Sequence, residues 1–326
     1  MSNIRDIAKA AKVSVTTVSR VLNNHPHVAK EKREAVLQAI QQLNYHQNIS
    51  AVHLSRGKTM VVGILCPFIN HSYYATLLEG IAEKAHSLGY KLMIIQTYYQ
   101  KDIELEALEM LKYKQIDSLI VLSRILSLNQ YEEYLSYGKI VMCEKVEHKG
   151  FQSIYIDQYS AFQCAFEFLV KKGHKNIGYS TGREMGYSSS QREKAYIEGL
   201  AAINQNLKKE WVFTNSFFLE DGKILLKNLL ELNTLPTALI VTNDMVAAGI
   251  ILESKKRPVE VPNNLSIIGF NNDSIAEAMG ITTISLPLKN MGSQALEYSL
   301  KKDVVSPIKV SFSLLVRDTV QQMNLL

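Results

Sequence analysis

Apolar residues near the start of the chain recur at the spacing of one helix face, in two short groups. The first group is Ile4, Ile7, Ala8 and Ala11, and the second is Val18, Val21 and Leu22. Between the groups, Ser14 is placed to accept a backbone N–H at the start of the second helix, and Val13 to fill the angle between the helices. The pattern predicts a helix-turn-helix motif, although a surface helical hairpin has the same spacing.

The second helix of this motif has an outer face of short side chains with one arginine. The residues expected to bind DNA there are Ser14, Val15, Thr16, Thr17, Ser19, Arg20 and Asn23. Hydroxyl and methyl groups near the start of such a helix suit the base edges of a major groove, and an arginine suits bases or phosphates. We therefore interpret this helix as a recognition helix.

A third helix is expected from about Ala29 to Leu43. Val36, Leu37, Ile40 and Leu43 recur at helical spacing and are expected to close a small core over the first two helices. The basic residues Lys30, Lys32 and Arg33 at its start either face phosphates or form a solvated helix end, and the pattern does not decide between these.

From Met60 onward, apolar strands alternate with amphipathic helices. The expected strands are Val61–Leu65, Lys91–Gln96, Ser118–Leu122, Ile140–Cys143, Ile177–Tyr179, Ala238–Thr242 and Leu265–Phe270. The expected helices are Tyr74–Leu88, Ile103–Lys114, Gln130–Tyr137, Ala161–Lys171, Gln191–Ile203, Gly222–Leu232 and Met245–Lys255. Such alternation predicts an α/β fold with two tandem lobes, each a doubly wound parallel sheet whose strand ends bind ligands.

Charge is divided unevenly between the two parts of the chain. The formal net charge is +5 over 326 residues, but residues 1–59 hold nine Lys and Arg against three Asp and Glu, which is +6. The remainder is therefore close to neutral. A basic module followed by a neutral one suits phosphate binding by the first part and sensing by the second.

The cysteines and the apolar runs argue against a disulfide-bonded, a zinc-binding and a membrane-spanning protein. Cys66, Cys143 and Cys164 are odd in number and form no Cys-x-x-Cys, so neither a disulfide framework nor a zinc site is predicted. The longest apolar run, Met60–Ile69, is interrupted by Gly63 and Pro67 and is too short to span a bilayer. With no apolar leader at its start, the chain is expected to be cytoplasmic and free of membranes.

Several motifs spread over the chain resemble the lac repressor (LacI/GalR) family of bacterial transcriptional regulators. They are Val18-Ser19-Arg20-Val21-Leu22-Asn23, Val28-Ala29, Leu43-Asn44-Tyr45, Asn48, Ala51, Leu54, Gly173-His174, Thr242-Asn243-Asp244 and the run from Pro262 to Phe270. The resemblance covers essentially the whole chain. It implies an N-terminal helix-turn-helix domain, a hinge, and two lobes of the type I periplasmic-binding-protein kind.

The resemblance also implies domain boundaries and a hinge. The implied domains are residues 1–45 for DNA binding, 46–59 for the hinge, and 60–326 for effector binding and dimerisation. The N-terminal lobe is about 60–156 plus 290–316, and the C-terminal lobe is about 157–289 plus 317–326. Within the hinge, Leu54 is the implied wedge between base steps in the minor groove, and Ala51 permits two hinges to pack closely.

This chain departs from the family pattern at three positions. Lys12 stands at the usual turn glycine of the helix-turn-helix, so a non-glycine residue must adopt a tight turn, with φ > 0 if the turn keeps its form. Gln47 stands at the usual proline of the hinge segment, directly before Asn48. Asn271 stands where many relatives have aspartate, which exchanges an anion for an amide that both donates and accepts.

Residues at the strand ends are expected to line an effector cleft. The expected effector-binding residues are Tyr73, Tyr74, Arg124, Glu144, Arg192, Asn243 and Asn271. Arg192 and Asn243 match motif positions that bind effector in the family and are the preferred candidates. For Asn70 and Asp244, helix capping is the preferred interpretation.

The resulting hypothesis is a homodimeric repressor that binds a pseudo-palindromic double-stranded operator and responds to a sugar or sugar phosphate, for example a maltodextrin-like sugar. It is expected to regulate carbohydrate use and to need no cofactor or metal. Alternatives are control by a phosphocarrier protein as corepressor, a transport-type sugar-binding protein, and an NAD-dependent enzyme. The last is disfavoured because the chain has neither a G-x-G-x-x-G loop nor a recognisable catalytic constellation.

Overall fold

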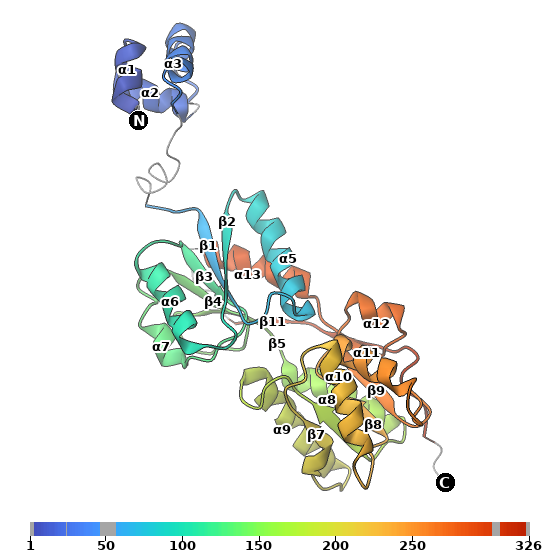
Figure 1. Cartoon of the computed structure of the whole chain (residues 1–326). Helices are drawn as coiled ribbons and strands as arrows, with labels where there is room; N and C mark the ends of the chain where they lie inside the picture. The colour runs from blue at the N-terminus through green and yellow to red at the C-terminus, as the bar shows by residue number, and fades with distance from the viewer. Residues whose placement is uncertain (1–2, 24, 46–56, 302–306, 324–326) are drawn as a thin grey trace. The chain divides into compact units, whose positions relative to one another are not determined.

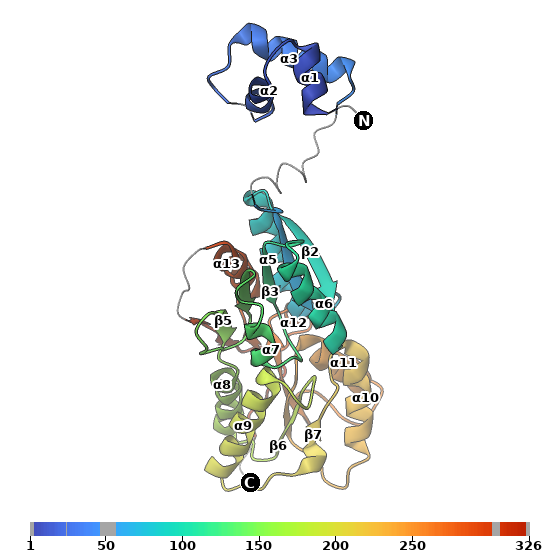
Figure 2. The same cartoon turned by 90° about the vertical axis from the view of Figure 1, so that its left-hand side faces the viewer.

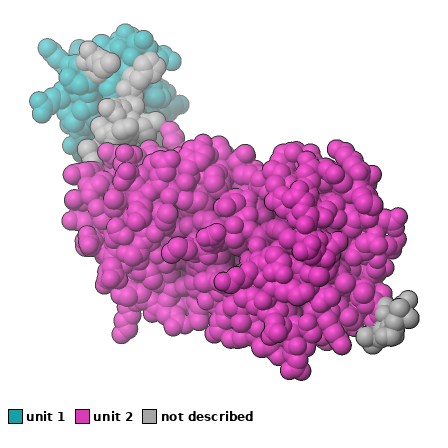
Figure 3. All heavy atoms as spheres, turned by 60° about the horizontal axis from the view of Figure 1, so that its bottom comes forward, with its two compact units in different colours: residues 1–58 teal, residues 59–326 magenta. Residues whose placement is uncertain are grey.

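The structure is a computed structural model that describes residues 3–23, 25–45, 57–301 and 307–323. The chain forms two compact units, Met1–Lys58 and Thr59–Leu326 (Figure 3). Each unit has its own hydrophobic core, as expected for a chain of this length.

The first unit contains three helices, α1 (Ile4–Ala10), α2 (Val15–Leu22) and α3 (Lys30–Gln42), as the sequence predicts (Figure 1). Their core consists of Ile7, Ala8, Val18, Val21, Val36 and Ala39. The expectation that Leu37 joins this core is wrong, because its side chain is 50% exposed. Leu37 lies about 100° around the helix from Val36, and the small Ala39 completes the buried stripe instead.

The turn between α1 and α2 has the features expected of a helix-turn-helix. The Ser14 hydroxyl accepts the backbone N–H of Thr17 at 3.1 Å and so caps α2. Val13 is partly buried against the small core. Lys12 has φ 53°, so the turn keeps the left-handed conformation even without glycine.

Replacing Ser14 by alanine is expected to destabilise the first unit by about 1 kcal/mol, because the N–H of Thr17 loses its side-chain acceptor. Hydrogen exchange at the Thr17 amide should accelerate accordingly. Ser14→Asp, which restores a capping oxygen, serves as the matched control. Equal exchange rates in the wild type and in Ser14→Ala would show that the cap contributes nothing.

The second unit contains two six-stranded sheets. The first sheet comprises β1 (Val61–Cys66), β2 (Lys91–Gln96), β3 (Ser118–Val121), β4 (Lys139–Met142), β5 (Gln152–Ile156) and β11 (Ile308–Val310). Its order is β11-β5-β4-β3-β1-β2, and every neighbouring pair is parallel. One face packs on α5 (Ser72–Ser87) and α13 (Leu288–Leu300), and the other on α6 (Lys101–Lys112) and α7 (Leu128–Glu132).

The second sheet comprises β6 (Ile177–Ser180), β7 (Val212–Phe213), β8 (Ala238–Ile240), β9 (Ser266–Asn271), β10 (Thr283–Ser285) and β12 (Ser313–Leu315). Its order is β12-β10-β9-β8-β6-β7. The pair β10–β12 is antiparallel, so the prediction of two wholly parallel sheets is wrong for this edge strand. β12 follows β11 of the other lobe after two residues, so it enters the second sheet from the side where the parallel strands end and runs antiparallel to them.

Helices cover both faces of the second sheet as well. α8 (Gln158–Lys171) and α9 (Tyr187–Ala202) lie on one side, with α10 (Leu219–Leu230) and α11 (Asp244–Ser254) on the other (Figure 2). The short helices are η1 (Lys209–Trp211) and α12 (Ser274–Ala278).

The predicted strands up to residue 143 and from 177 to 270 are all present. The five strands β5, β7, β10, β11 and β12, and the helices α12 and α13, have no counterpart in the sequence-based prediction. The helix expected at 130–137 is instead α7, which ends at Glu132. The helices α8 to α11 each begin one to four residues earlier than predicted, because the residues just before the predicted starts are mostly polar.

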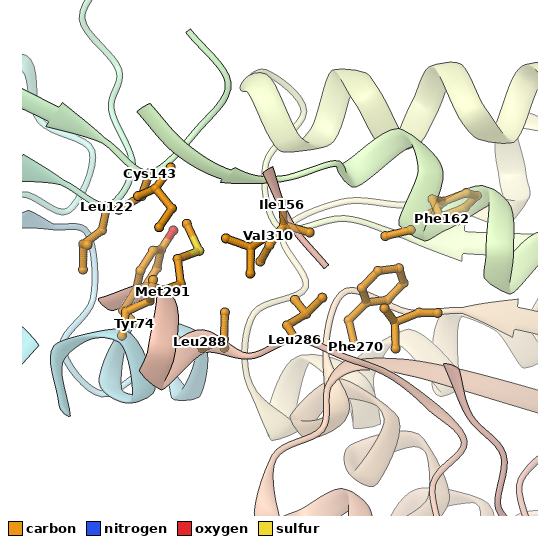
Figure 4. Packing of buried hydrophobic residues seen from close by; sticks show 14 of the residues in the cluster. Tyr74, Leu122, Cys143, Ile156, Phe162, Phe270, Leu286, Leu288, Met291 and Val310 are labelled. Atoms are coloured by element: carbon orange, nitrogen blue, oxygen red, sulfur yellow. The ribbon is translucent and has the colours of Figure 1, made fainter. Parts of the chain in front are cut away.

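The chain passes between the two lobes three times, and the hydrophobic core is continuous along these connections. The passes run from β5 to α8, from β10 to α13 and from β11 to β12. Near these passes, Ile156, Leu286 and Val310 join the buried residues of both sheets into one cluster (Figure 4). The three connections between the lobes are therefore packed in apolar side chains. The carboxyl ends of the strands of the two lobes face each other.

Three further observations bear on the class of protein. The cysteines Cys66, Cys143 and Cys164 are free. Within the described ranges, His, Cys, Asp and Glu side chains form no group suited to a metal ion. No helix there is both long and apolar enough to cross a membrane.

Candidate functional site

A hollow of about 110 Å³ lies between the lobes of the second unit. Six of the residues predicted for an effector cleft line it: Tyr73, Tyr74, Glu144, Arg192, Asn243 and Asn271. Their shared position follows from the topology, because they come from the first turn of a helix or the carboxyl end of a strand. Aromatic rings and several polar groups converge on this hollow, as they do in small-molecule sites.

Arg192 lies on α9 with its side chain buried at the base of the hollow. Its Nε donates to Gln158 Oε1 and its Nη1 to the carbonyl oxygen of Thr242, each at 3.0 Å. The guanidinium also stacks on the Phe270 ring, 4.0 Å from its centroid. Burial lowers the pKa of Arg192 to about 10, so it stays protonated at neutral pH.

Asn243 caps α11 and also reaches across the hollow. Its Oδ1 accepts the backbone N–H of Val246 at 3.0 Å, and its Nδ2 donates to the carbonyl oxygen of Phe217. The same Nδ2 lies 3.1 Å from His71 Nε2 on the opposite lobe. Since the amide orientation is fixed by the cap, His71 Nε2 is the acceptor and the ring proton belongs on Nδ1.

His71 therefore presents a neutral imidazole with an N–H at its second nitrogen. The side chain is 7% exposed, and burial lowers its pKa to about 4. Its Nδ1 has no hydrogen-bond partner among the described residues. His71 lines the hollow, while its Nδ1 is buried and has this N–H unpaired within the described part of the chain.

The preferred capping roles of Asn70 and Asp244 are wrong. The residue before α5 is His71, and Asn70 is an exposed turn residue. Asp244 is the first residue of α11 rather than its cap. Its carboxylate accepts the Asp273 backbone N–H at 2.8 Å and the Thr283 hydroxyl at 2.7 Å, which ties α11 to the ends of β9 and β10.

Tyrosines form the wall of the hollow on the first lobe. The hydroxyls of Tyr74 and Tyr99 are 2.9 Å apart, and the rings of Tyr73 and Tyr74 meet edge to face. Burial raises the pKa of both Tyr73 and Tyr74, so they remain neutral donors. Such rings can stack on the apolar face of a sugar while their hydroxyls bind its polar edge.

Arg124 and Glu144 form an ion pair rather than two separate ligand-binding groups. Arg124 Nε lies 2.5 Å from Glu144 Oε1, and Arg124 also donates to the carbonyl oxygen of Leu126. Only Glu144 of this pair lines the hollow. Burial raises the pKa of Glu144, and the Arg124 charge opposes that rise.

The sequence-based prediction missed the lining residues His71, Tyr99, Arg183 and Phe217. Tyr99 lies three residues after the predicted strand Lys91–Gln96, and this position at a strand end marks it as a candidate lining residue. Arg183 lies in an irregular loop after β6, and Phe217 precedes α10, where no strand was predicted nearby.

Arg183 connects the two lobes at the edge of the hollow. Its guanidinium stacks on Tyr99, 3.9 Å from the ring centroid, and its Nη2 lies within 3.5 Å of Ser123 Oγ and of the Arg124 carbonyl oxygen. A Cβ at Gly186 would lie 2.6 Å from Arg183 Nη2, so this glycine makes room for the guanidinium. Arg183 and Asn243 thus each bridge one lobe to the other.

In the first unit, α2 presents the residues predicted to bind DNA. Val15, Thr16 and Arg20 are exposed, with Val15 at 43%. The other four predicted residues form hydrogen bonds within the motif. The hydroxyls of Ser14 and Thr17 bond each other, and Asn23 Nδ2 donates to the Ser19 carbonyl oxygen. The hinge residues Ala51 and Leu54 lie outside the described residues, so their roles stay predictions.

Two family models match the chain. Residues 3–48 match the bacterial regulatory proteins of the lacI family, and residues 59–317 match the periplasmic binding proteins and sugar binding domain of the LacI family. The second match alone spans well over half of the chain.

Relatives and a solved structure agree with these models. The HTH-type transcriptional regulator YkvZ of Bacillus subtilis (strain 168) is 40% identical over 98% of this chain and 100% of its own. NtdR of the same organism, named as the NTD biosynthesis operon regulator, is 38% identical over 91% of each. The lac repressor dimer bound to operator and the anti-inducer ONPF has a TM-score of 0.85 at 20% identity, covering 98% of this chain and 99% of its own.

These relatives are transcriptional regulators rather than enzymes, and the predicted fold and family are confirmed. The chain belongs to the LacI family of bacterial DNA-binding transcriptional regulators.

Proposed function

We propose that this regulator works as a homodimer on a pseudo-palindromic operator, and that a small saccharide-type effector in the interlobe hollow sets its operator affinity. The observation that carries the proposal is a hollow lined from both lobes, where Arg183 and Asn243 already connect the two sides. A ligand there must touch both lobes and therefore favours one lobe arrangement over another. Regulation of carbohydrate use is the biological role that fits such an effector.

The DNA-binding half of the proposal rests on α2. Val15 and Thr16 stand at its first two positions, where side chains of a recognition helix reach base edges. Both offer methyl groups to thymine, and Thr16 also offers a hydroxyl. Arg20, in the last turn, supplies positive charge.

Replacing Arg20 by alanine is expected to reduce operator affinity by about 1–3 kcal/mol, because the substitution removes an exposed cation from the recognition helix. If Arg20 binds a phosphate, the slope of log K against log salt should also become shallower by about one. Binding measured by fluorescence anisotropy over a salt series provides both quantities. Arg257→Ala, which removes an arginine from the second unit, should leave both unchanged.

The path from the hollow to the first unit begins at the first residues of the second. The carboxylate of Asp117 accepts the backbone N–H groups of Thr59 and Met60, at 2.6 and 2.9 Å. Movement of the first lobe is thereby transmitted to the segment that leads to the DNA-binding unit. A coupling free energy of about 1–3 kcal/mol changes operator affinity about 5- to 150-fold.

Arg192→Ala tests the effector half of the proposal. Operator binding by the wild type and by the variant should be measured across titrations with mono-, di- and oligosaccharides and their phosphates. We expect one class of these compounds to change wild-type affinity at least fivefold and to change the variant much less. If both proteins respond equally, the hollow is not the effector site; if neither responds to any small molecule, control by a phosphocarrier protein becomes the better explanation.

A further inference from the structure

We propose that the effector is an anion, a saccharide that bears a phosphate or a carboxylate, with its charged group held by Arg192 and Arg183. This inference rests on the proposed function and specifies the chemistry of its ligand. It follows from the charges that line the hollow, where two guanidinium groups face the ligand space and one carboxylate is already paired.

Arg192 is expected to bind an anion more strongly than Arg183, because its guanidinium is buried. Its partners, the Gln158 amide oxygen, the Thr242 carbonyl oxygen and the Phe270 ring, are all neutral. Among the described residues, no carboxylate lies within 4.0 Å of its guanidinium. A buried cation without a counterion is costly, and an anion in the adjoining hollow would relieve that cost.

Arg183 adds a second cation from the loop after β6. Its contacts across the hollow are also neutral: the Tyr99 ring, the Ser123 hydroxyl and the Arg124 carbonyl oxygen. The two hydrogen bonds are long, at 3.5 and 3.3 Å, so a phosphate or carboxylate oxygen offers Arg183 a stronger charge-assisted partner.

The acidic groups nearby offset these charges only in part, because the Glu144 carboxylate feels the charges of both Arg124 and Arg183. Glu144 lines the hollow but is bound to Arg124 on its own lobe. At the end of β9, the lining residue is the neutral Asn271. Asp244 lies behind it, with its oxygens bonded to Thr283 and to the Asp273 backbone. The lining therefore has a surplus of positive charge.

The rest of the hollow suits the body of a saccharide. Tyr73, Tyr99 and Phe217 supply ring faces, and Ser189 and Thr181 supply hydroxyls. Neutral groups of this kind bind hydroxyls and ring faces, which leaves the two arginines to select for charge.

The first experiment uses inorganic phosphate as the probe. Thermal unfolding of the full chain should be followed in 0–50 mM phosphate at constant ionic strength. We expect a saturable rise in Tm for the wild type, a loss of that rise in Arg192→Gln, and a weakened rise in Arg183→Gln. Arg257→Gln, which changes an exposed arginine on the second unit, should behave as the wild type. No saturable rise, or an equal rise in Arg192→Gln and the wild type, would overturn the proposal.

The second experiment separates the sources of the anion. Binding of glucose, glucosamine, glucuronate and glucose 6-phosphate, and of the matching disaccharide series, should be measured by calorimetry. We expect at least one phosphorylated or carboxylated compound to bind tenfold or more tightly than its neutral and amino counterparts, with that preference lost in Arg192→Gln and reduced in Arg183→Gln. Tighter binding of a neutral or amino sugar would overturn the anionic inference while leaving the proposed saccharide control intact. Conversely, an anion that binds the hollow without changing operator affinity would confirm anion binding by the two arginines but contradict the proposed function.

Discussion

Gly249→Ala is expected to destabilise the second unit by up to about 2 kcal/mol. Helices α10 and α11 cross with their backbones in contact, at Gly222 of the first and Gly249 of the second. A Cβ at Gly249 would lie 2.0 Å from the Leu219 carbonyl oxygen, and one at Gly222 would lie 2.1 Å from the Val246 carbonyl oxygen. Both obstacles are backbone atoms, so the helices must move apart, and overpacking of this kind costs about 1–3 kcal/mol or more. The gain in helix propensity from glycine to alanine, roughly 1 kcal/mol, offsets only part of that cost.

Urea unfolding of the full chain measures this effect as a lower midpoint at an unchanged slope. Asn228→Ala, at an exposed position of α10, is the matched control and should be neutral or slightly stabilising. The position of Asn243 in the hollow should also shift, because Asn243 caps α11 and Asp244 is the first residue of that helix. An unchanged midpoint in Gly249→Ala would mean that the crossing has room the structure does not show.

The helix-turn-helix was predictable because its signals are local. Cap chemistry at Ser14 and 3.6-residue spacing in α1 and α2 depend on neighbours within one or two turns. The positive φ at Lys12 was anticipated for the same reason, since the turn leaves little choice of backbone. Leu37 was misplaced because a run of apolar residues does not reveal which of two adjacent positions faces the core.

The alternation of strands and helices predicted the two lobes, but not how the chain returns between them. The strands β11 and β12 have three residues each, and their pairing partners lie far away in sequence, at β5 and β10. Such strands are stabilised by non-local pairing and carry a weak local signal. The antiparallel edge formed by β12 depends on that return path.

The cleft was predicted where a motif or a strand end marked it, as for Arg192 and Asn243. Arg183 was missed because its place depends on Tyr99 of the other lobe, a contact that no local pattern encodes. Arg124 was placed among the ligand-binding residues because a strand end does not tell a lining side chain from one paired behind it.

Asp244 is expected to give the second unit a pH dependence that an asparagine would remove. Its side chain is fully buried, and burial raises its pKa to about 7, against the hydrogen bonds from Thr283 and the Asp273 backbone that lower it. The nearby Asp273 carboxylate contributes to this rise in pKa. The folded protein therefore binds this proton more tightly than the unfolded chain, and the free energy of unfolding rises as pH falls from 7 toward the unfolded value of 3.8.

Between pH 8 and pH 5, this rise amounts to about 3 kcal/mol, since each pH unit below the folded pKa contributes roughly 1.4 kcal/mol. Buried histidines act in the opposite sense: His71 and His174 have lowered pKa values, so they reduce stability as pH falls below 6.5. A comparison with Asp244→Asn cancels their contribution, because both proteins retain them. Urea unfolding at pH 8 and pH 5 should show the wild type gaining about 3 kcal/mol relative to the variant. A constant difference between the two proteins over this range would mean that Asp244 titrates as an exposed carboxylate does, and that the tie between α11, β9 and β10 is open to water.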